Sequence, residues 1–484
     1  MQDLFFLIQS LSPNEKRYVS IYINKFSSTK NNYSILYQHI EKQTEYDEVE
    51  LVKKLRKEPF VKHIAVTKHY LFELILNAMR EYYDEQFLEW KLKKQAAQIF
   101  VLSSKGLDKA AHKLLLKTKE EAWQYENYYV LLDIINHEKW LFGNRRIEIK
   151  NTQYGIEICE EENKAFFNLK VIQDYKTIWH ELTFLELTHI NYSVKDFQTK
   201  LTECTKHPLL QQKMETSSYL IKTWYHSVWA HYFMLMQDKQ QHFEHYREVV
   251  KIREQQLTAQ PQIPLDLLAT YYNFMMACYQ NNAWTDLELY LQKIQTIETK
   301  SIEKKIKFFH DYYHGALLFY LGTKQYENGY ALINEIQIGL KEYKNKIRLD
   351  FLIWIWQCCG LICFFNKKYK EANKWWQQIQ QLDKTEIELK TQCSVELYSL
   401  MLTIEEHNFD VFDYQIKQVQ NRINECKLND NLVLAFLQFC KKIDKNPHLK
   451  DEIIKKEKQD LLIMQSQYTS SVFDEFIVTW LISK

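Results

Sequence analysis

The stretch FLIWIWQCCGLICFFNKKYKEANKWW, residues 351–376, decides how the rest of the chain is interpreted. Its first fifteen residues contain one strongly polar side chain, Gln357, and three cysteines. Fifteen positions are too few to cross a hydrocarbon core, which takes about 20 residues. We therefore interpret this run as a helix packed between neighbours, and we expect no membrane span.

The same arrangement returns along the chain at a nearly constant spacing. Trp284, Tyr326, Tyr369 and Phe409 follow one another at intervals of 42, 43 and 40 residues, and each comes after an apolar segment and a short polar turn. Three residues after each aromatic residue, a mostly apolar row begins at the i, i+4, i+7 spacing of one helical face. The four rows are Leu287, Leu291 and Ile294; Gly329, Ile333 and Ile336; Ala372, Trp376 and Ile379; Phe412, Ile416 and Val419.

A helix hairpin that repeats every 20–50 residues is typical of a solenoid, because each hairpin buries its apolar face only against its neighbours. The segments GALLFYLGTKQYENGYALINEI and CGLICFFNKKYKEANKWWQQI also resemble tetratricopeptide (TPR) repeats, with small residues at Gly360 and Ala372. Leu317 and Met275 fill the first small position in their units, and the spacing exceeds the family's repeat of about 34 residues. The resemblance is clear over about 265–425, and the overall layout is similar to tetratricopeptide-like proteins of Bacteroidota.

Glycine and proline are scarce, with eight and six in 484 residues. Strand-rich folds and phosphate-binding loops need glycine where the backbone takes positive φ or lies against a phosphate. No G-x-G-x-x-G and no G-x-x-x-x-G-K-[ST] motif occurs, which argues against nucleotide-dependent enzymes. The sequence predicts an all-α fold, a right-handed solenoid of antiparallel TPR-like helix hairpins with a small N-terminal helical module.

The charge balance and the cysteines bear on nucleic-acid binding and on the cellular compartment. The 63 Lys and Arg residues nearly balance 62 Asp and Glu residues, whereas nucleic-acid binding needs clustered positive charge. The nine cysteines include no C-x-x-C pair, and the start MQDLFFLIQSLSPNEKRY has no basic segment ahead of its apolar residues. We expect a cytoplasmic protein without a secretory signal.

Domain organisation follows from these patterns. We expect an N-terminal helical module over 1–82, degenerate helical repeats over 83–260, TPR-like repeats over 261–428 and capping helices over 429–484. In the degenerate region, KGLDKAAHKLLLK, with Leu107 followed by Ala110 and Leu114, suggests an earlier unit of the repeat.

The N-terminal module opens with a capping box. Ser12-Pro13-Asn14-Glu15 places Ser at the N-cap and Glu three residues later, so a helix begins there. Three more helices are expected, the last over about 65–82. The last two resemble a helix-turn-helix, which leaves open a second hypothesis, a transcriptional regulator whose DNA contacts come from Lys62, Lys68 and His69.

Motifs for chemistry are weak. His310 and His314 have the spacing that lets two imidazoles reach one zinc ion, but no third ligand is evident, and we interpret them as solvent-facing or groove-lining. Cys359 and Cys363 are interpreted as buried structural thiols. No nucleophile motif occurs, so we expect no metal, no cofactor and no enzymatic activity.

The leading hypothesis is a scaffold or adaptor that binds another protein or a peptide. The resemblance to TPR proteins implies that the first helices of the hairpins line a concave groove. Aromatic side chains there supply contact area, and polar ones hold a ligand backbone. The residues that this transfer places near the groove are Tyr272, Met276, Tyr279, Asp311, His314, Leu318, Trp354, Gln357 and Leu361.

Overall fold

The computed structural model describes residues 2–25, 32–84, 87–147, 153–188, 192–211, 216–260, 266–298, 302–343, 346–383, 387–425, 431–467 and 475–484. Within these ranges the regular structure is helical, and no strand is present. The predicted all-α class is therefore confirmed. The chain divides into two compact units, Met1–Thr270 and Tyr271–Lys484. The boundary lies within helix α14 (Leu267–Gln280), ten residues beyond the 260/261 border proposed from the sequence.

The N-terminal module has a core of its own, built from apolar residues between Leu4 and Met79. The predicted capping box is present: the Ser12 amide donates to Glu15 Oε2 at 2.6 Å, and the Glu15 amide donates to Ser12 Oγ at 3.4 Å. The four predicted helices are confirmed, and a further helix precedes them. The elements are α1 (Gln2–Ser10), α2 (Pro13–Lys25), α3 (Asn32–Glu41), α4 (Glu48–Leu55), η1 (Pro59–His63) and α5 (Ile64–Tyr83).

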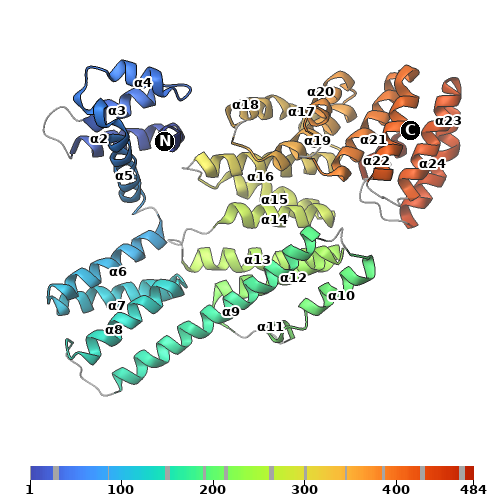
Figure 1. The fold of residues 1–484 in the computed structure, drawn as a ribbon. Helices are drawn as coiled ribbons and strands as arrows, with labels where there is room; N and C mark the ends of the chain where they lie inside the picture. Colours follow the sequence, from blue (N-terminus) through green and yellow to red (C-terminus); the bar gives the residue numbers. More distant parts are fainter. Residues whose placement is uncertain are drawn as a thin grey trace. The chain divides into compact units, whose positions relative to one another are not determined.

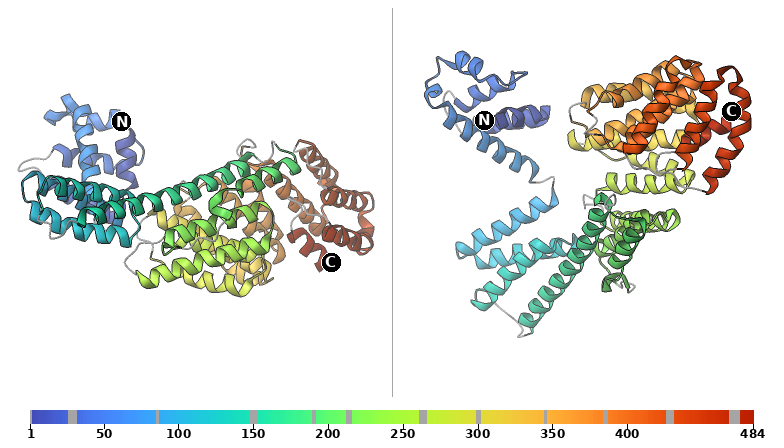
Figure 2. Two further views of the ribbon diagram at one scale, coloured as in Figure 1. Left: turned by 90° about the horizontal axis from the view of Figure 1, so that it is seen from below. Right: turned by 45° about the vertical axis from the view of Figure 1, so that its right-hand side comes forward.

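The remainder of this unit is a succession of neighbouring helices around a second core. Helix α9 is 35 residues long and packs against α8, α10 and α12 (Figures 1 and 2). In the segment KGLDKAAHKLLLK the buried residues are Ala111 and Leu115, each one position after Ala110 and Leu114. The helices are α6 (Leu88–Ser104), α7 (Asp108–Gln124), α8 (Tyr128–Gly143), α9 (Tyr154–Thr188), α10 (Val194–Cys204), α11 (Pro208–Gln211), α12 (Tyr219–Leu235) and α13 (Lys239–Ala259).

The C-terminal unit contains the helix pairs that the aromatic spacing predicts. Trp284, Tyr326 and Tyr369 are the first residues of their helices, and Phe409 begins the short turn η3 before α22. All twelve residues of the four predicted rows are buried. The elements are α15 (Trp284–Gln295), α16 (Ile302–Gly322), α17 (Tyr326–Ala331), α18 (Ile333–Tyr343), α19 (Leu349–Phe365), α20 (Tyr369–Gln380), α21 (Leu389–Glu406), η3 (Phe409–Val411), α22 (Phe412–Glu425), α23 (Asn431–Lys445), η4 (Pro447–Leu449), α24 (Lys450–Gln467) and α25 (Glu475–Ser483).

Helix α19 contains the stretch quoted first, and it is buried on most sides by α16, α17 and α20. Cys359 and Cys363 are fully buried free thiols, as predicted, and burial raises the pKa of both. Gly360 allows a close approach, because a Cβ atom there would lie 2.1 Å from Nε1 of the buried Trp376 on α20. In the described parts of the chain, every helix is too short or too polar to span a membrane.

The turns between paired helices share one geometry. Asn282, Lys324, Lys367 and His407 have φ of 56°, 60°, 59° and 54°. After α19, the Lys368 amide donates to the Cys363 carbonyl at 2.9 Å and the Lys367 amide to the Phe364 carbonyl at 2.8 Å. These two bonds form a Schellman motif, which usually has glycine at the left-handed position. Here residues with a Cβ atom fill this position, so the scarcity of glycine in the sequence does not indicate the absence of such turns.

We expect Gly360→Ala to lower the free energy of unfolding by about 1–3 kcal/mol, because the added methyl group overpacks the contact with Trp376. Gly143→Ala is the matched control, since no atom lies within 4 Å of the Cβ position at the end of α8, and it should cost nothing. Urea denaturation followed by circular dichroism measures both. Equal midpoints for Gly360→Ala and the wild-type protein would contradict the packing described.

Lys367→Gly should stabilise the protein by about 1 kcal/mol, because an L-residue pays for the left-handed conformation and glycine does not. Lys368→Gly is the control at the next position, where φ is −91° and glycine only adds flexibility to the unfolded chain. The two variants should therefore shift the urea midpoint in opposite directions. A loss of stability in Lys367→Gly would show that the side chain makes a contact that outweighs the strain.

Candidate functional site

The nine residues predicted to line a groove lie on α14, α16 and α19, and their exposure differs widely. Tyr272, Met276 and Tyr279 on α14 are half-buried. Asp311, His314, Leu318 and Leu361 are buried, whereas Gln357 is half-buried and Trp354 is 41% exposed. Trp354 is therefore the member of this set that presents the most of its own surface to a ligand.

Three of these residues meet in an aromatic cluster across the three helices. The hydroxyl of Tyr272 lies 2.8 Å from Nδ1 of His314, and the Trp354 ring stacks on His314 with centroids 5.2 Å apart. His310 stacks on Phe351 in the same way, at 3.6 Å. Each contact joins α16 to a neighbouring helix, so the cluster holds these helices together.

The charges inside the cluster are paired. Asp311 is 1% exposed and accepts hydrogen bonds from Nζ of Lys307 and Nδ1 of His310, both at 2.8 Å. His310 is fully buried, contrary to the expectation of a solvent-facing or groove-lining side chain. Its Nε2 has no hydrogen-bond partner among the described residues. No group of three potential metal ligands occurs in the described part of the chain.

Burial, together with the neighbouring His310, lowers the pKa of His314 to about 3, and burial raises the pKa of Tyr272. Both side chains are therefore neutral at physiological pH, and each serves the other as a hydrogen-bond partner. The cluster is a closed interior contact with one exposed edge at Trp354.

The low pKa of His314 makes stability depend on pH. In the unfolded chain this histidine titrates near 6.5 and in the folded chain at about 3, so between these values the unfolded state binds more protons. The free energy of unfolding falls as pH drops from 6.5 towards 3, by up to about 1.4 kcal/mol per pH unit from this group. His314→Gln should flatten the dependence measured by urea denaturation at several pH values. Parallel curves for the two proteins would contradict this account.

A second site in the C-terminal unit is open. A groove of about 450 Å³ lies between α20, α21 and α22. Its lining is dominated by side chains that both donate and accept hydrogen bonds. The amide and hydroxyl residues are Asn373, Gln377, Gln380, Gln392, Ser399, Thr403, Asn408, Tyr414, Gln415 and Gln418.

Helix α21 forms the floor of this groove. It packs against α20 on one side and α22 on the other, and one row of its residues lines the groove between them. In that row Glu406 is exposed, Glu396 and Ser399 are half-buried, and Gln392 and Thr403 are buried. That row is polar at helical spacing, and none of its residues is among those predicted to bind a partner. The signal was present in QCSVELYSLMLTIEE, where polar residues return every three or four positions between apolar ones: Gln392, Glu396, Ser399, Thr403 and Glu406.

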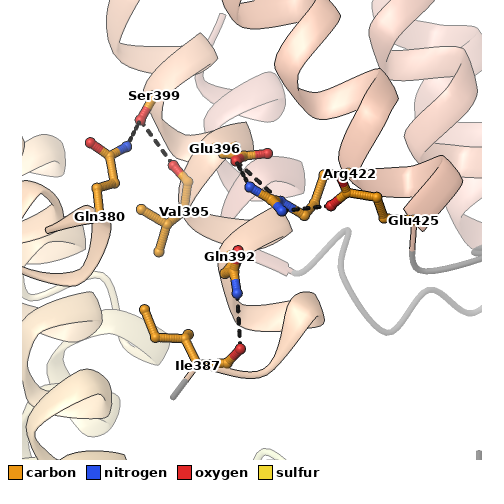
Figure 3. A network of polar contacts seen from close by, with 8 residues as sticks. All are labelled: Gln380, Ile387, Gln392, Val395, Glu396, Ser399, Arg422 and Glu425. Carbon is orange, nitrogen blue, oxygen red and sulfur yellow. Dashed lines mark hydrogen bonds and ion pairs between the residues drawn. The ribbon is translucent and has the colours of Figure 1, made fainter. Parts of the chain in front are cut away.

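Hydrogen bonds fix the walls of the groove to its floor (Figure 3). Gln380 on α20 donates to Ser399 Oγ at 3.1 Å. From α22, Arg422 donates to Glu396 on the floor at 3.3 Å and to Glu425 at 2.6 Å. Thr403 donates to Oε1 of Gln415 at 2.8 Å, which leaves the amide NH₂ of that glutamine available to a ligand.

The groove is negatively charged. Burial lowers the pKa of Arg422, but Glu396 and Glu425 raise it by more, so this guanidinium stays charged between two carboxylates. Glu406 at the end of α21 is exposed and forms no ion pair with the described residues. The lining thus contains two carboxylates, Glu396 and Glu406, and one cation, Arg422.

The candidate DNA-binding residues of the N-terminal module are not equivalent. Lys62 and His69 are exposed, but Lys68 is 3% exposed. Nζ of Lys68 donates to Glu48 at 2.8 Å and to the hydroxyl of Tyr46 at 3.1 Å. The prediction that Lys68 contacts a DNA phosphate is therefore wrong, because its charge is buried and already paired.

Comparison of the chain with protein-family models, with curated proteins and with solved structures finds no match. Function is therefore inferred from the residues of the two sites.

Proposed function

We propose that the chain is a non-enzymatic scaffold or adaptor that binds a segment of another protein in the groove along α21. The observation that carries the proposal is the groove itself, a volume of about 450 Å³ with amide and hydroxyl groups on its floor and both walls. It lies in the stack of helix pairs but apart from the face predicted on α14, α16 and α19, which is closed by its own contacts.

The chemistry of the lining suits a polypeptide backbone. Each primary amide offers two donors and an acceptor, so a row of them can pair with the alternating N–H and C=O groups of an extended chain. On the floor, Glu406 lies fourteen positions after Gln392, or about 21 Å along the helix. At about 3.3 Å per residue, that length accommodates roughly six extended residues.

The proposal includes the architecture and the cellular setting. We propose that the helix pairs from α14 to α22 form a right-handed solenoid of TPR-like hairpins, which the common Schellman turn and the buried rows support.

We also propose a cytoplasmic location. The cysteines that the structure describes are free thiols, most of them buried, which suits a reducing compartment.

The test is capture of a partner by the tagged full-length protein from its native cell, with and without nuclease. Gln418→Trp places a bulky ring on an exposed wall position of the groove, and Gln378→Trp makes the same change at an exposed position of α20 outside the lining. We expect the wild-type protein and Gln378→Trp to retain one defined partner after nuclease treatment. Gln418→Trp should retain at least tenfold less.

Equal retention by both variants would show that the groove is not the binding site. Recovery of nucleic acid and its associated proteins alone would favour the regulator hypothesis. Circular dichroism of each variant controls for folding.

A further inference from the structure

One end of the groove combines an acidic and an aromatic side chain. Glu406 is the last residue of α21, and Tyr414 lies in the first turn of α22, after the short connection through η3. Both line the groove, and Tyr414 is 66% exposed. The hydrogen bond from Thr403 to Gln415 ties the two helices together beside them.

The two ends of the groove differ in how their charges are satisfied. At the Glu396 end, Arg422 already neutralises a carboxylate. At the Glu406 end no cation is supplied by the described residues, because Lys450 donates to the Ile404 carbonyl at 3.3 Å and contacts His407 at 3.0 Å instead. A carboxylate and an exposed aromatic face at the same end of a groove attract a cation through an ion pair and a cation–π contact.

We propose that this end of the groove is a recognition pocket for a lysine or arginine side chain of the bound segment. The inference rests on the proposed function, and it names the chemistry of the partner: an extended segment with a basic residue held by Glu406 and Tyr414. Glu396 lies ten residues before Glu406, or about 15 Å along the floor, so the basic residue anchors one end of a segment that continues for about four residues over the amides.

The test uses a bead library of random octapeptides with acetylated N-termini and amidated C-termini, sorted on the full-length protein. Enriched peptides should carry Lys or Arg at one fixed position. For these peptides Glu406→Gln should weaken binding about fivefold, and so should Tyr414→Leu, which removes the aromatic face. Tyr414→Phe keeps that face and should bind as the wild-type protein does.

Asp410→Asn is the matched control for the charge, since Asp410 is exposed in η3 and does not line the groove. It should leave the affinity unchanged. Raising the salt concentration should weaken the enriched peptides in the wild-type protein more than in Glu406→Gln, because only the former retains the ion pair.

The outcomes separate the two proposals. Enriched peptides that lack Lys and Arg but are lost in Gln418→Trp would overturn the basic anchor and leave the groove as a peptide site. Enrichment of basic peptides that Asp410→Asn weakens as much as Glu406→Gln would also overturn the anchor, by showing a diffuse charge effect. No enrichment over Gln418→Trp would overturn both the anchor and the proposed groove.

Discussion

The C-terminal unit depends on one constraint: its first helices are apolar on more sides than a single partner helix can cover. Helix α19 buries eleven of its seventeen residues, and it does so only because α16 and α17 lie against it in addition to its own partner α20. Close contact at Gly360 brings Trp376 down onto the α19 backbone. A second close contact forms where Ile362 lies against Gly329 of α17. Adding neighbours is thus the way in which this sequence buries its apolar surface.

The groove exists because α21 departs from that pattern. Helix α19 has Gln357 as its one strongly polar residue after Phe351, whereas α21 carries a polar row along the line between its two neighbours. Burying such a row under another helix would leave polar groups without partners, at a cost of about 1–3 kcal/mol for each. The structure limits this cost through hydrogen bonds from or to Gln380, Gln415 and Arg422. Of the row itself only Glu406 is exposed, whereas Gln392 and Thr403 are buried.

Much of the fold was predictable because burial at i, i+4 and i+7 leaves a direct trace in the sequence, as at Ala372, Trp376 and Ile379. The candidate site was less predictable than the fold. The resemblance to TPR repeats placed groove residues only as far as α19, so the polar row of α21 was missed although its periodicity is visible in the sequence. The burial of Lys68 depends on Glu48, twenty residues away on another helix, and no local pattern reports such a pair. The left-handed turns could not be predicted from the sequence either, because Lys367 and His407 occupy positions where glycine is usually found.

The two sites of this unit show what separates an interior contact from a binding surface. In the aromatic cluster, Tyr272 and His314 satisfy each other, and a pKa of about 3 keeps His314 uncharged, so little is left for a ligand. In the groove, the amides retain unused donors and acceptors, but each hydrogen bond to a backbone contributes only about 0.5–1.5 kcal/mol net. Ordering an extended segment opposes binding by several kcal/mol, so amide pairing alone gives a weak and unselective complex. A charged group at one end of the floor supplies the register and selectivity that a row of similar amides lacks. Glu406 is exposed and lies at the same end of the groove as the exposed Tyr414, which meets that requirement.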